Sequence, residues 1–434
     1  MATPVHYDVL VLGGGSAGCV LAARLSEDEN RTVCLVEAGP DYGPHDAGGW
    51  PGELLDSGGI PEGHQWDPDE SPHSPLRAKV LGGCSAHNAC LLVWPPDADP
   101  GLELYLRRAL ETIAPEPFFF REDEYTPWFA GVAEACSAHG LDVAAGPYNI
   151  RNGVRWNAAF AYVDPARQRS NLTVRGDALV DRVLFERDRA AGAVVDGEPV
   201  HADQIVLSAG ACGSPAILLR SGVGPEAELD ALGIDVVAPL DGVGSNLQDH
   251  VSAKLVFEPS DELRERTRAR APVPFSNGLA KTDELHVLPI AGRNGESAHL
   301  TVALLQPHSR GRVRLRSRDP AVSPEIDHRL LSDRRDRQAL LAGLGLAHRL
   351  AAAETLRRLG RPVELPDEER IDSTLGIYFH PVGTCATGSV VDEDGRVHGF
   401  ENLYVADASV LATIPRANTH LATLAIAEKL GSRL

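Results

Sequence analysis

The stretch Tyr7-Asp8-Val9-Leu10-Val11-Leu12-Gly13-Gly14-Gly15-Ser16-Ala17-Gly18 decides the fold class of this 434-residue chain. Its apolar first half reads as a buried strand, and residues 19–26 read as the helix that follows. A G-x-G-x-x-G run between a strand and a helix is typical of dinucleotide-binding units, because its glycines let a pyrophosphate approach the N-terminus of the helix. We expect the dinucleotide to be contacted by Gly13, Gly15, Ser16 and Gly18.

An acidic residue follows the glycines at the spacing that dinucleotide-binding units use for the ribose. Residues 31–36 read as a second strand, and Glu37 follows it, 19 positions after Gly18. A carboxylate at this spacing accepts hydrogen bonds from the ribose hydroxyls of the adenosine half. A strand–turn–helix without a ligand is the alternative, and the register of strand, glycines, helix and acid favours the dinucleotide.

Composition narrows the class of protein. The net charge of −20 disfavours nucleic acid and anionic membrane surfaces as partners. No apolar run is long enough to span a bilayer, and the first strand begins too early to leave room for a signal peptide. Seven cysteines without a C-x-x-C pair argue against a disulfide framework or a zinc site. We expect a cytoplasmic protein of two or three domains with no metal site. A homodimer stays open as its assembly.

A second glycine-rich stretch lies at 79–94, K-V-L-G-G-C-S-A-H-N-A-C-L-L-V-W. Taken by itself it allows a loop with a surface histidine as the alternative. It resembles the flavin-contacting segment of the glucose–methanol–choline (GMC) oxidoreductases, above all of the choline-oxidase type, in which the matching histidine carries the flavin covalently. The resemblance implies FAD bonded through His87, with further contacts from Gly82, Gly83, Asn88 and Ala89.

The middle of the chain continues the resemblance. Residues 171–174, 180–185 and 204–207 read as strands, and 208–224 is similar to the second signature of the family, in which small residues border the dinucleotide. The resemblance implies FAD contacts from Val180 and Ala209, and a helix opened by Ser-Pro would hold Pro215 in its first turn. The stretch 242–250, G-V-G-S-N-L-Q-D-H, is another hallmark. For its Asp249 and His250 a structural and a catalytic role both stay open.

The C-terminal part carries the chemistry that the family implies. Residues 378–385, Y-F-H-P-V-G-T-C, resemble the H-x-x-G-T segment whose histidine faces the flavin, which makes His380 the expected catalytic residue. The strand and turn at 403–410 would return to the cofactor, with Asp407 and Ala408 in contact with it. Asn418 matches the position that pairs with the catalytic histidine. His420 is the alternative by two residues, and is otherwise expected beside the cofactor.

The chemistry explains the choice of residue types. Alcohol oxidation removes a proton from oxygen and a hydride from carbon, and a flavin takes the hydride. The protein must supply a base near neutral pKa, for which histidine is suited, while Asn418 would hydrogen-bond the substrate oxygen. The resemblance implies an FAD-dependent alcohol oxidoreductase with oxygen as acceptor. The alternatives are a dehydrogenase using a quinone, protein or peptide-derived acceptor, and a lyase or binding protein that keeps FAD without redox chemistry.

Departures from the family bear on the substrate. The chain is shorter than typical members after Trp94 and over 254–300, regions that build the lid and the substrate pocket. Choline oxidases surround the trimethylammonium group with aromatic rings and a carboxylate. Here Trp50 matches one such position approximately, Phe379 stands where they carry Tyr, and Glu296 is the candidate for the carboxylate. These differences disfavour choline.

The fold class expected from these patterns is α/β, with a doubly wound FAD-binding domain and an inserted, mainly antiparallel substrate domain. The alternating segments 300–305 and 312–315 read as strands with one wet face, and 340–359 reads as one amphipathic helix. We assign 1–115, 166–253 and 372–434 to the FAD-binding domain. Residues 116–165 and 254–371 are assigned to the substrate domain.

Overall fold

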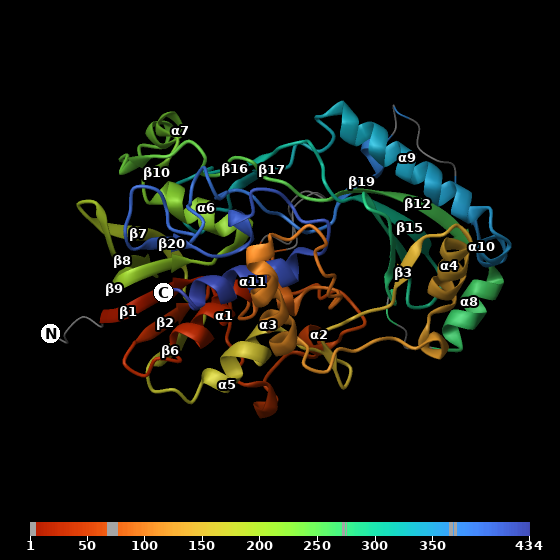
Figure 1. Ribbon diagram of the computed structural model, residues 1–434, viewed down its shortest axis with the longest axis horizontal. Coiled ribbons are helices and arrows are strands. Elements are labelled where there is room, and N and C mark those ends of the chain that lie inside the picture. The colour runs from red at the N-terminus through yellow and green to blue at the C-terminus, as the bar shows by residue number, and fades with distance from the viewer. Residues whose placement is uncertain (1–5, 67–76, 271–273, 275, 364–367, 369–370) are drawn as a thin grey trace.

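The computed structural model of the chain describes residues 6–66, 77–270, 274, 276–363, 368 and 371–434. Two lobes lie next to each other along the long axis (Figure 1). One is built around strands β1 (His6–Leu12), β2 (Val33–Val36) and β9 (Glu198–Leu207), and the other around β12 (Val251–Pro259), β14 (Leu285–Ala291) and β15 (Ala298–Leu304). No helix within the described ranges is long and apolar enough to cross a membrane.

The first lobe contains a mainly parallel sheet in the order β6-β2-β1-β9-β8-β7, with β20 beside β9. Strand β1 is covered on both faces, because Val9 and Val11 pack with helices α1 and α11 while Leu10 and Leu12 pack with helix α6. This is the pattern of a doubly wound unit. The parallel strands are β1 (His6–Leu12), β2 (Val33–Val36), β6 (Leu172–Arg175), β9 (Glu198–Leu207) and β20 (Leu403–Val405). The covering helices are α1 (Ser16–Leu25), α6 (Gly210–Arg220) and α11 (Thr419–Gly431), and the antiparallel strands are β7 (Val180–Glu186) and β8 (Arg189–Val195).

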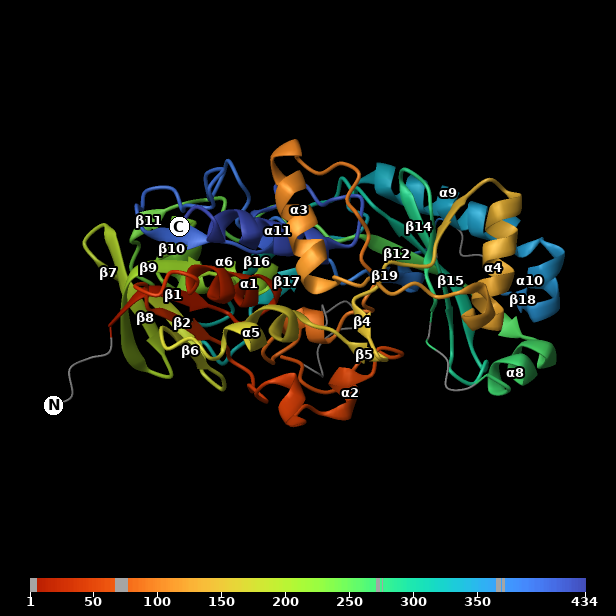
Figure 2. The ribbon, with the colours of Figure 1, turned by 60° about the horizontal axis from the view of Figure 1, so that its bottom comes forward.

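The second lobe contains an antiparallel sheet in the order β18-β12-β15-β14-β13-β3, with β19 beside β12. Along β12, Ala253, Leu255 and Phe257 are buried while Lys254, Val256 and Glu258 are exposed, so one face of this strand meets solvent. Helices α4, α9 and α10 lie at this end of the molecule (Figure 2). The elements are β3 (Asp142–Ala144), β12 (Val251–Pro259), β13 (Leu279–Lys281), β14 (Leu285–Ala291), β15 (Ala298–Leu304), β18 (Gly360–Pro362), β19 (Leu375–Ile377), α4 (Pro127–Ala138), α9 (Arg334–Ala351) and α10 (Glu354–Leu359).

The remaining helices and strands lie outside the two sheets. They are α2 (Gly52–Leu55), α3 (Glu103–Ile113), β4 (Ile150–Arg151), β5 (Val154–Arg155), α5 (Asp164–Ala166), β10 (Val223–Gly224), α7 (Glu226–Ala231), β11 (Ala238–Pro239), α8 (Asp261–Arg268), β16 (Arg312–Arg314) and β17 (Glu325–Asp327). Two short 3₁₀ turns matter for the site, η2 (Gly83–Ala86) and η7 (Ala408–Val410). The expected α/β fold class with a parallel and an antiparallel sheet is confirmed.

The single helix predicted over 340–359 is wrong, because α9 ends at Ala351 and α10 begins at Glu354. Of the two residues between them, Ala352 has helical backbone and Ala353 has extended backbone. The break lets α10 turn onto α4, where a Cβ on Gly131 would lie 2.6 Å from Leu359. Tertiary packing thus overrides the high helix propensity of the three alanines at 351–353.

The position predicted for Pro215 is also wrong. Helix α6 begins at Gly210, so Pro215 lies inside it and not in its first turn. Because proline has no N–H, the carbonyl of Ala211 four residues earlier lacks its helical partner. The hydroxyl of Thr384 donates to that carbonyl at 2.6 Å. A side chain from the C-terminal part therefore completes a helix of the dinucleotide unit.

Candidate active site

The three glycines of the first motif have three different roles. Gly13 has φ of +111°, and a Cβ on it would lie 2.7 Å from the Cα of Ala209, so the turn requires glycine. A Cβ on Gly18 would lie 1.9 Å from the carbonyl oxygen of Gly13, which keeps α1 close to β1. A Cβ on Gly15 would lie 3.9 Å from the nearest atom, so space remains open in front of Ser16 at the N-terminus of α1. This open cradle fits the pyrophosphate of a dinucleotide.

The second glycine stretch packs against the first. The backbone N–H of Gly82 donates to the carbonyl of Gly14 at 2.8 Å. A Cβ on Gly83 would lie 2.6 Å from the Cα of Gly15, and both Gly82 and Gly83 have positive φ. The structure thus brings together two motifs that are separated by a long stretch of sequence. The turn η2 then leads the chain directly to His87.

Glu37 lies at the end of β2 and is 7% exposed. Its two carboxylate oxygens accept from the backbone N–H groups of Gly14 and Gly39, each at 2.9 Å. Burial raises the pKa of Glu37 to about 7, while those backbone donors oppose the rise. A carboxylate has about four lone-pair sites, so capacity remains for ribose hydroxyls. Val180 begins β7 nearby, since the backbone N–H of Ala178 donates to the carbonyl of Glu37.

Asp407 joins the second signature to the C-terminal segment. Its carboxylate accepts from the N–H of Gly210 at 2.8 Å, from the Ser214 hydroxyl at 2.5 Å and from the N–H of Ser409 at 2.8 Å. Burial raises the pKa of Asp407, and these donors oppose the rise. The N–H of Ala209 in turn donates to the Ser214 hydroxyl. These bonds hold η7, including Ala408, against the start of α6.

His87 is buried, and neither ring nitrogen has a hydrogen-bond partner among the described residues. Buried polar atoms without partners are rare in folded proteins and need an explanation. Burial, and then the positive charges of Arg155 and His64, lower the pKa of His87 to about 4. The imidazole is therefore neutral at pH 7 and keeps a free lone pair. A ligand beside η2 would account for this arrangement, and the flavin part of FAD fits it.

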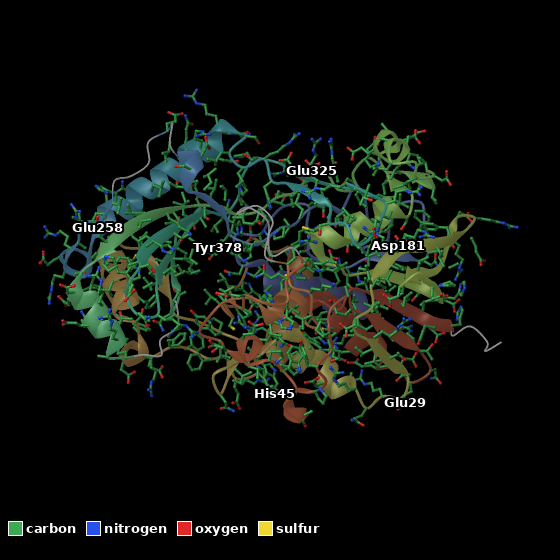
Figure 3. The ribbon with its side chains drawn as sticks, turned by 180° about the vertical axis from the view of Figure 1, so that it is seen from behind. Glu29, His45, Asp181, Glu258, Glu325 and Tyr378 are labelled. Carbon is green, nitrogen blue, oxygen red and sulfur yellow. The ribbon has the colours of Figure 1, made fainter. Side chains whose placement is uncertain are left out.

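His380 lies at the centre of a cluster of rings that follows β19. Its Nδ1 is 2.9 Å from Nδ1 of His250, and its backbone N–H donates to Asp249 at 2.9 Å. The ring of Tyr378 lies 4.5 Å from that of His380 between centroids. Tyr378 sits on the side of the antiparallel lobe that faces the other lobe (Figure 3). The motif that ends in His250 was visible in the sequence, but its contact with His380 was not.

The electrostatics of this cluster favour a neutral base. Burial first, and then the neighbouring His250, His286 and His420, hold the pKa of His380 well below its usual 6.5. No hydrogen bond to Nε2 of His380 is present within the described part of the chain. A neutral imidazole with a free nitrogen is able to accept a proton.

The N-terminus of α11 contributes further polar atoms. Asn418 is the N-cap residue of α11, but its side chain makes no capping bond, and its Oδ1 is buried without a partner in the part of the chain that the structure describes. Nε2 of His420 is also buried without a partner, and its Nδ1 lies 3.3 Å from the Asn88 side-chain nitrogen. The other side-chain atom of Asn88, Oδ1, accepts from the N–H of Cys90. The stretch that follows His87 therefore meets the stretch that follows Asn418.

The three residues considered for substrate binding have different surroundings. Trp50 packs in the first lobe against Phe160 and donates its indole N–H to the carbonyl of Gly43. Glu296 lies between β14 and β15, where it is exposed and paired with Arg268. Phe379 has positive φ and is 47% exposed. The aromatic and carboxylate partners expected for a trimethylammonium group are thus not assembled from these three residues.

Comparison with known proteins identifies the family. The family description "GMC oxidoreductase" matches residues 130–252 with its N-terminal part and 307–427 with its C-terminal part. Choline oxidase of Arthrobacter globiformis is 31% identical, over 98% of this chain and 93% of that protein. The chain belongs to the GMC oxidoreductase family. An oxygen-dependent choline dehydrogenase of Pseudomonas fluorescens is also 31% identical, over 99% of this chain and 94% of that protein.

Solved structures of GMC oxidoreductases share the fold over nearly the whole chain. Pyridoxine 4-oxidase from Mesorbium loti superposes with a TM-score of 0.82 at 25% identity, covering 98% of this chain and 99% of that one. A formate oxidase of Aspergillus oryzae has a TM-score of 0.83 at 22% identity, covering 99% and 98%. Residues 8–67 also match a family described as lycopene cyclase protein, a stretch that holds β1, α1 and β2. The protein is thus an FAD-dependent oxidoreductase of the GMC type.

Proposed function

We propose that this GMC oxidoreductase oxidises an uncharged alcohol to the carbonyl compound, with His380 as the base and oxygen as the electron acceptor. The observation that carries the proposal is the neutral His380, whose Nε2 has no partner among the described residues. It shares its site with buried, unpartnered polar atoms of His87, Asn418 and His420. The names of choline oxidase and pyridoxine 4-oxidase support an alcohol substrate and oxygen.

The residues divide the work as follows. Gly13, Gly15, Glu37 and the turn before His87 would hold FAD, which would supply the hydride acceptor. His380 accepts the hydroxyl proton at Nε2, and the Asn418 amide donates a hydrogen bond to the same substrate oxygen. The backbone N–H of His380 donates to Asp249, and this bond fixes the segment that carries the base.

One experiment separates the proposal from its alternatives. Purified enzyme is mixed with a panel of primary and secondary alcohols in air, and both flavin bleaching and hydrogen peroxide are followed. Bleaching with stoichiometric peroxide supports the oxidase. Bleaching that persists in air, and is reversed only by an added quinone or dye, supports the dehydrogenase. If no alcohol bleaches the flavin, a lyase or binding protein is the better description.

The covalent bond to FAD through His87 has a direct readout. We expect acid-precipitated enzyme to stay yellow, and its intact mass to exceed that of the chain by one FAD. The physical reason is the neutral, buried and unpartnered imidazole, which is a nucleophile at pH 7. His87→Ala should retain FAD by non-covalent contacts and release it into the acid supernatant. Release of all colour from the parent enzyme would show that the flavin is only bound.

Choline should be a poor substrate. Glu296 is remote from the site, and the carboxylate beside the His380 segment, Asp249, has its pKa raised to about 7 by burial. A trimethylammonium group in such a site loses hydration without a counter-charge. We expect 3,3-dimethyl-1-butanol, the uncharged isostere of choline, to have at least about 10-fold higher kcat/KM, which corresponds to about 1.4 kcal/mol. A higher value for choline would contradict an uncharged substrate class.

The pH dependence of flavin reduction should follow from the lowered pKa of His380. Because burial disfavours the imidazolium, the neutral base persists below the usual pKa of 6.5 and is lost only as the pH falls through the lowered value. We expect the anaerobic rate at saturating alcohol to be level from about pH 8 down to about 6.5 and to fall at lower pH. The flavin spectrum at each pH controls for unfolding. A midpoint at or above 6.5 would contradict this environment for the base.

A further inference from the structure

His250 makes hydrogen bonds with both of its ring nitrogens. It is fully buried immediately before β12, and its Nε2 lies 3.0 Å from the carbonyl oxygen of Pro415. A carbonyl oxygen only accepts, so Nε2 of His250 carries the proton. A neutral imidazole has one N–H, and therefore Nδ1 of His250 is an acceptor.

The same argument shows which nitrogen of His380 carries the proton. Nδ1 of His250 lies 2.9 Å from Nδ1 of His380, and the two rings are nearly perpendicular, with 89° between their planes. Since the His250 nitrogen accepts, Nδ1 of His380 must donate. The single proton of neutral His380 is then on Nδ1, and its Nε2 keeps the lone pair.

We propose that His250 is a positioning residue, which holds His380 in the tautomer whose Nε2 is the base. The proposal rests on the proposed function of His380 and deepens it. The carbonyl of Pro415 is the fixed end of the chain of hydrogen bonds. In the opposite tautomer of His380, the proton would lie on Nε2 and two Nδ1 lone pairs would face each other at 2.9 Å. Which nitrogen of a histidine carries the proton is generally set by the bond that the other nitrogen makes.

The surroundings of His250 keep this arrangement intact near neutral pH. Burial lowers the pKa of His250 to about 4, against the opposing effect of the carbonyls of Pro415 and Leu305. The titratable groups around the two rings are Asp249 beside β12, His286 on β14, Tyr378 after β19 and His420 on α11. A protonated His250 would donate from both nitrogens and oppose the Nδ1 proton of His380. Its burial as a neutral ring therefore protects the base.

Nitrogen-15 NMR of the histidine rings in the FAD-loaded enzyme tests the proposal without turnover. The His380→Ala spectrum assigns the His380 signals by their loss. We expect a protonated Nδ1 and an unprotonated Nε2 in the parent, and a shift towards the Nε2–H form in His250→Leu. His250→Asn offers an oxygen near the former Nδ1 and should restore the parent pattern in part. A parent His380 with its proton on Nε2, or an unchanged His380 pattern in His250→Leu, would overturn the proposal.

Kinetics supply the second readout. We expect His250→Leu to lower the anaerobic flavin-reduction rate by about 10- to 100-fold with FAD content unchanged, the usual cost of removing a partner that orients a histidine. His250→Asn should lose less. If no alcohol reduces the parent flavin, the proposed function fails while the tautomer remains testable by NMR. If the parent is active and its tautomer is the opposite one, only the role of His250 fails. A His250→Leu protein that does not fold leaves the parent spectrum and His250→Asn as the deciding measurements.

Discussion

Replacing His380 with alanine is expected to lower the rate of anaerobic flavin reduction by about 10²- to 10⁴-fold, the usual contribution of a general base. The neutral ring with a free Nε2 is the acceptor that the alcohol proton needs, and the substitution removes it. FAD content should not change, because the glycine cradle and Glu37 lie on other segments. Stopped-flow mixing with saturating alcohol measures the rate, and the flavin spectrum measures occupancy. A His380→Ala enzyme that is reduced as fast as the parent would remove the basis of the catalytic assignment.

Two further variants serve as controls and decide the second role. Asn418→Ala should slow reduction less than His380→Ala, because it removes a hydrogen bond and leaves the base. His420→Ala tests the competing assignment, since Nε2 of His420 is also buried and unpartnered. If His420→Ala slows reduction more than Asn418→Ala with FAD still bound, the oxygen-binding role belongs to His420.

Replacing Gly15 with leucine is expected to give a protein that purifies without FAD. The glycine has ordinary φ, and a Cβ on it would meet nothing closer than 3.9 Å, so the fold accommodates the added Cβ. The longer side chain then fills the open space at the N-terminus of α1 that a pyrophosphate needs. The ratio of flavin to protein absorbance measures the loss, and circular dichroism reports the fold.

Gly52→Leu is the matched control for that substitution. Gly52 begins α2, is exposed and has no atom within 4 Å of an added Cβ. This variant should purify as yellow as the parent. A fully yellow Gly15→Leu protein would mean that the pyrophosphate does not approach the chain at this glycine.

The parts of the fold that could be predicted are those whose signal is local. The strand ending at Leu12, its glycines and helix α1 form one continuous pattern, and the structure follows it within a few residues. Pro215 was misplaced because the first N–H of α6, on Gly210, is bonded by Asp407, 197 positions away. No sequence pattern near the start of α6 indicates a carboxylate that is so distant in the chain. The domain boundaries and the individual FAD contacts stay predictions.

In the site, too, short motifs could be predicted from the sequence, whereas contacts between distant residues could not. Motifs were enough to nominate His87 and His380, because each lies in a distinctive short stretch. The partnership of His250 with His380 joins residues 130 positions apart through one hydrogen bond, which no periodicity encodes. Trp50 packs within the first lobe, and its part in substrate recognition stays a prediction.

The hydrogen bond from the Thr384 hydroxyl to the carbonyl of Ala211 in α6 also bears on how the catalytic base is held. It anchors the loop just after His380 to α6, and the N–H of Cys385 adds a second anchor at the carbonyl of Ser409. His380 is therefore held from two sides, because the loop after it is anchored to α6 while its ring bonds to His250 immediately before β12. Changes in the antiparallel sheet that keep His250 and the strand pairing of β12 with β19 are then able to alter substrate preference while both anchors of the base persist.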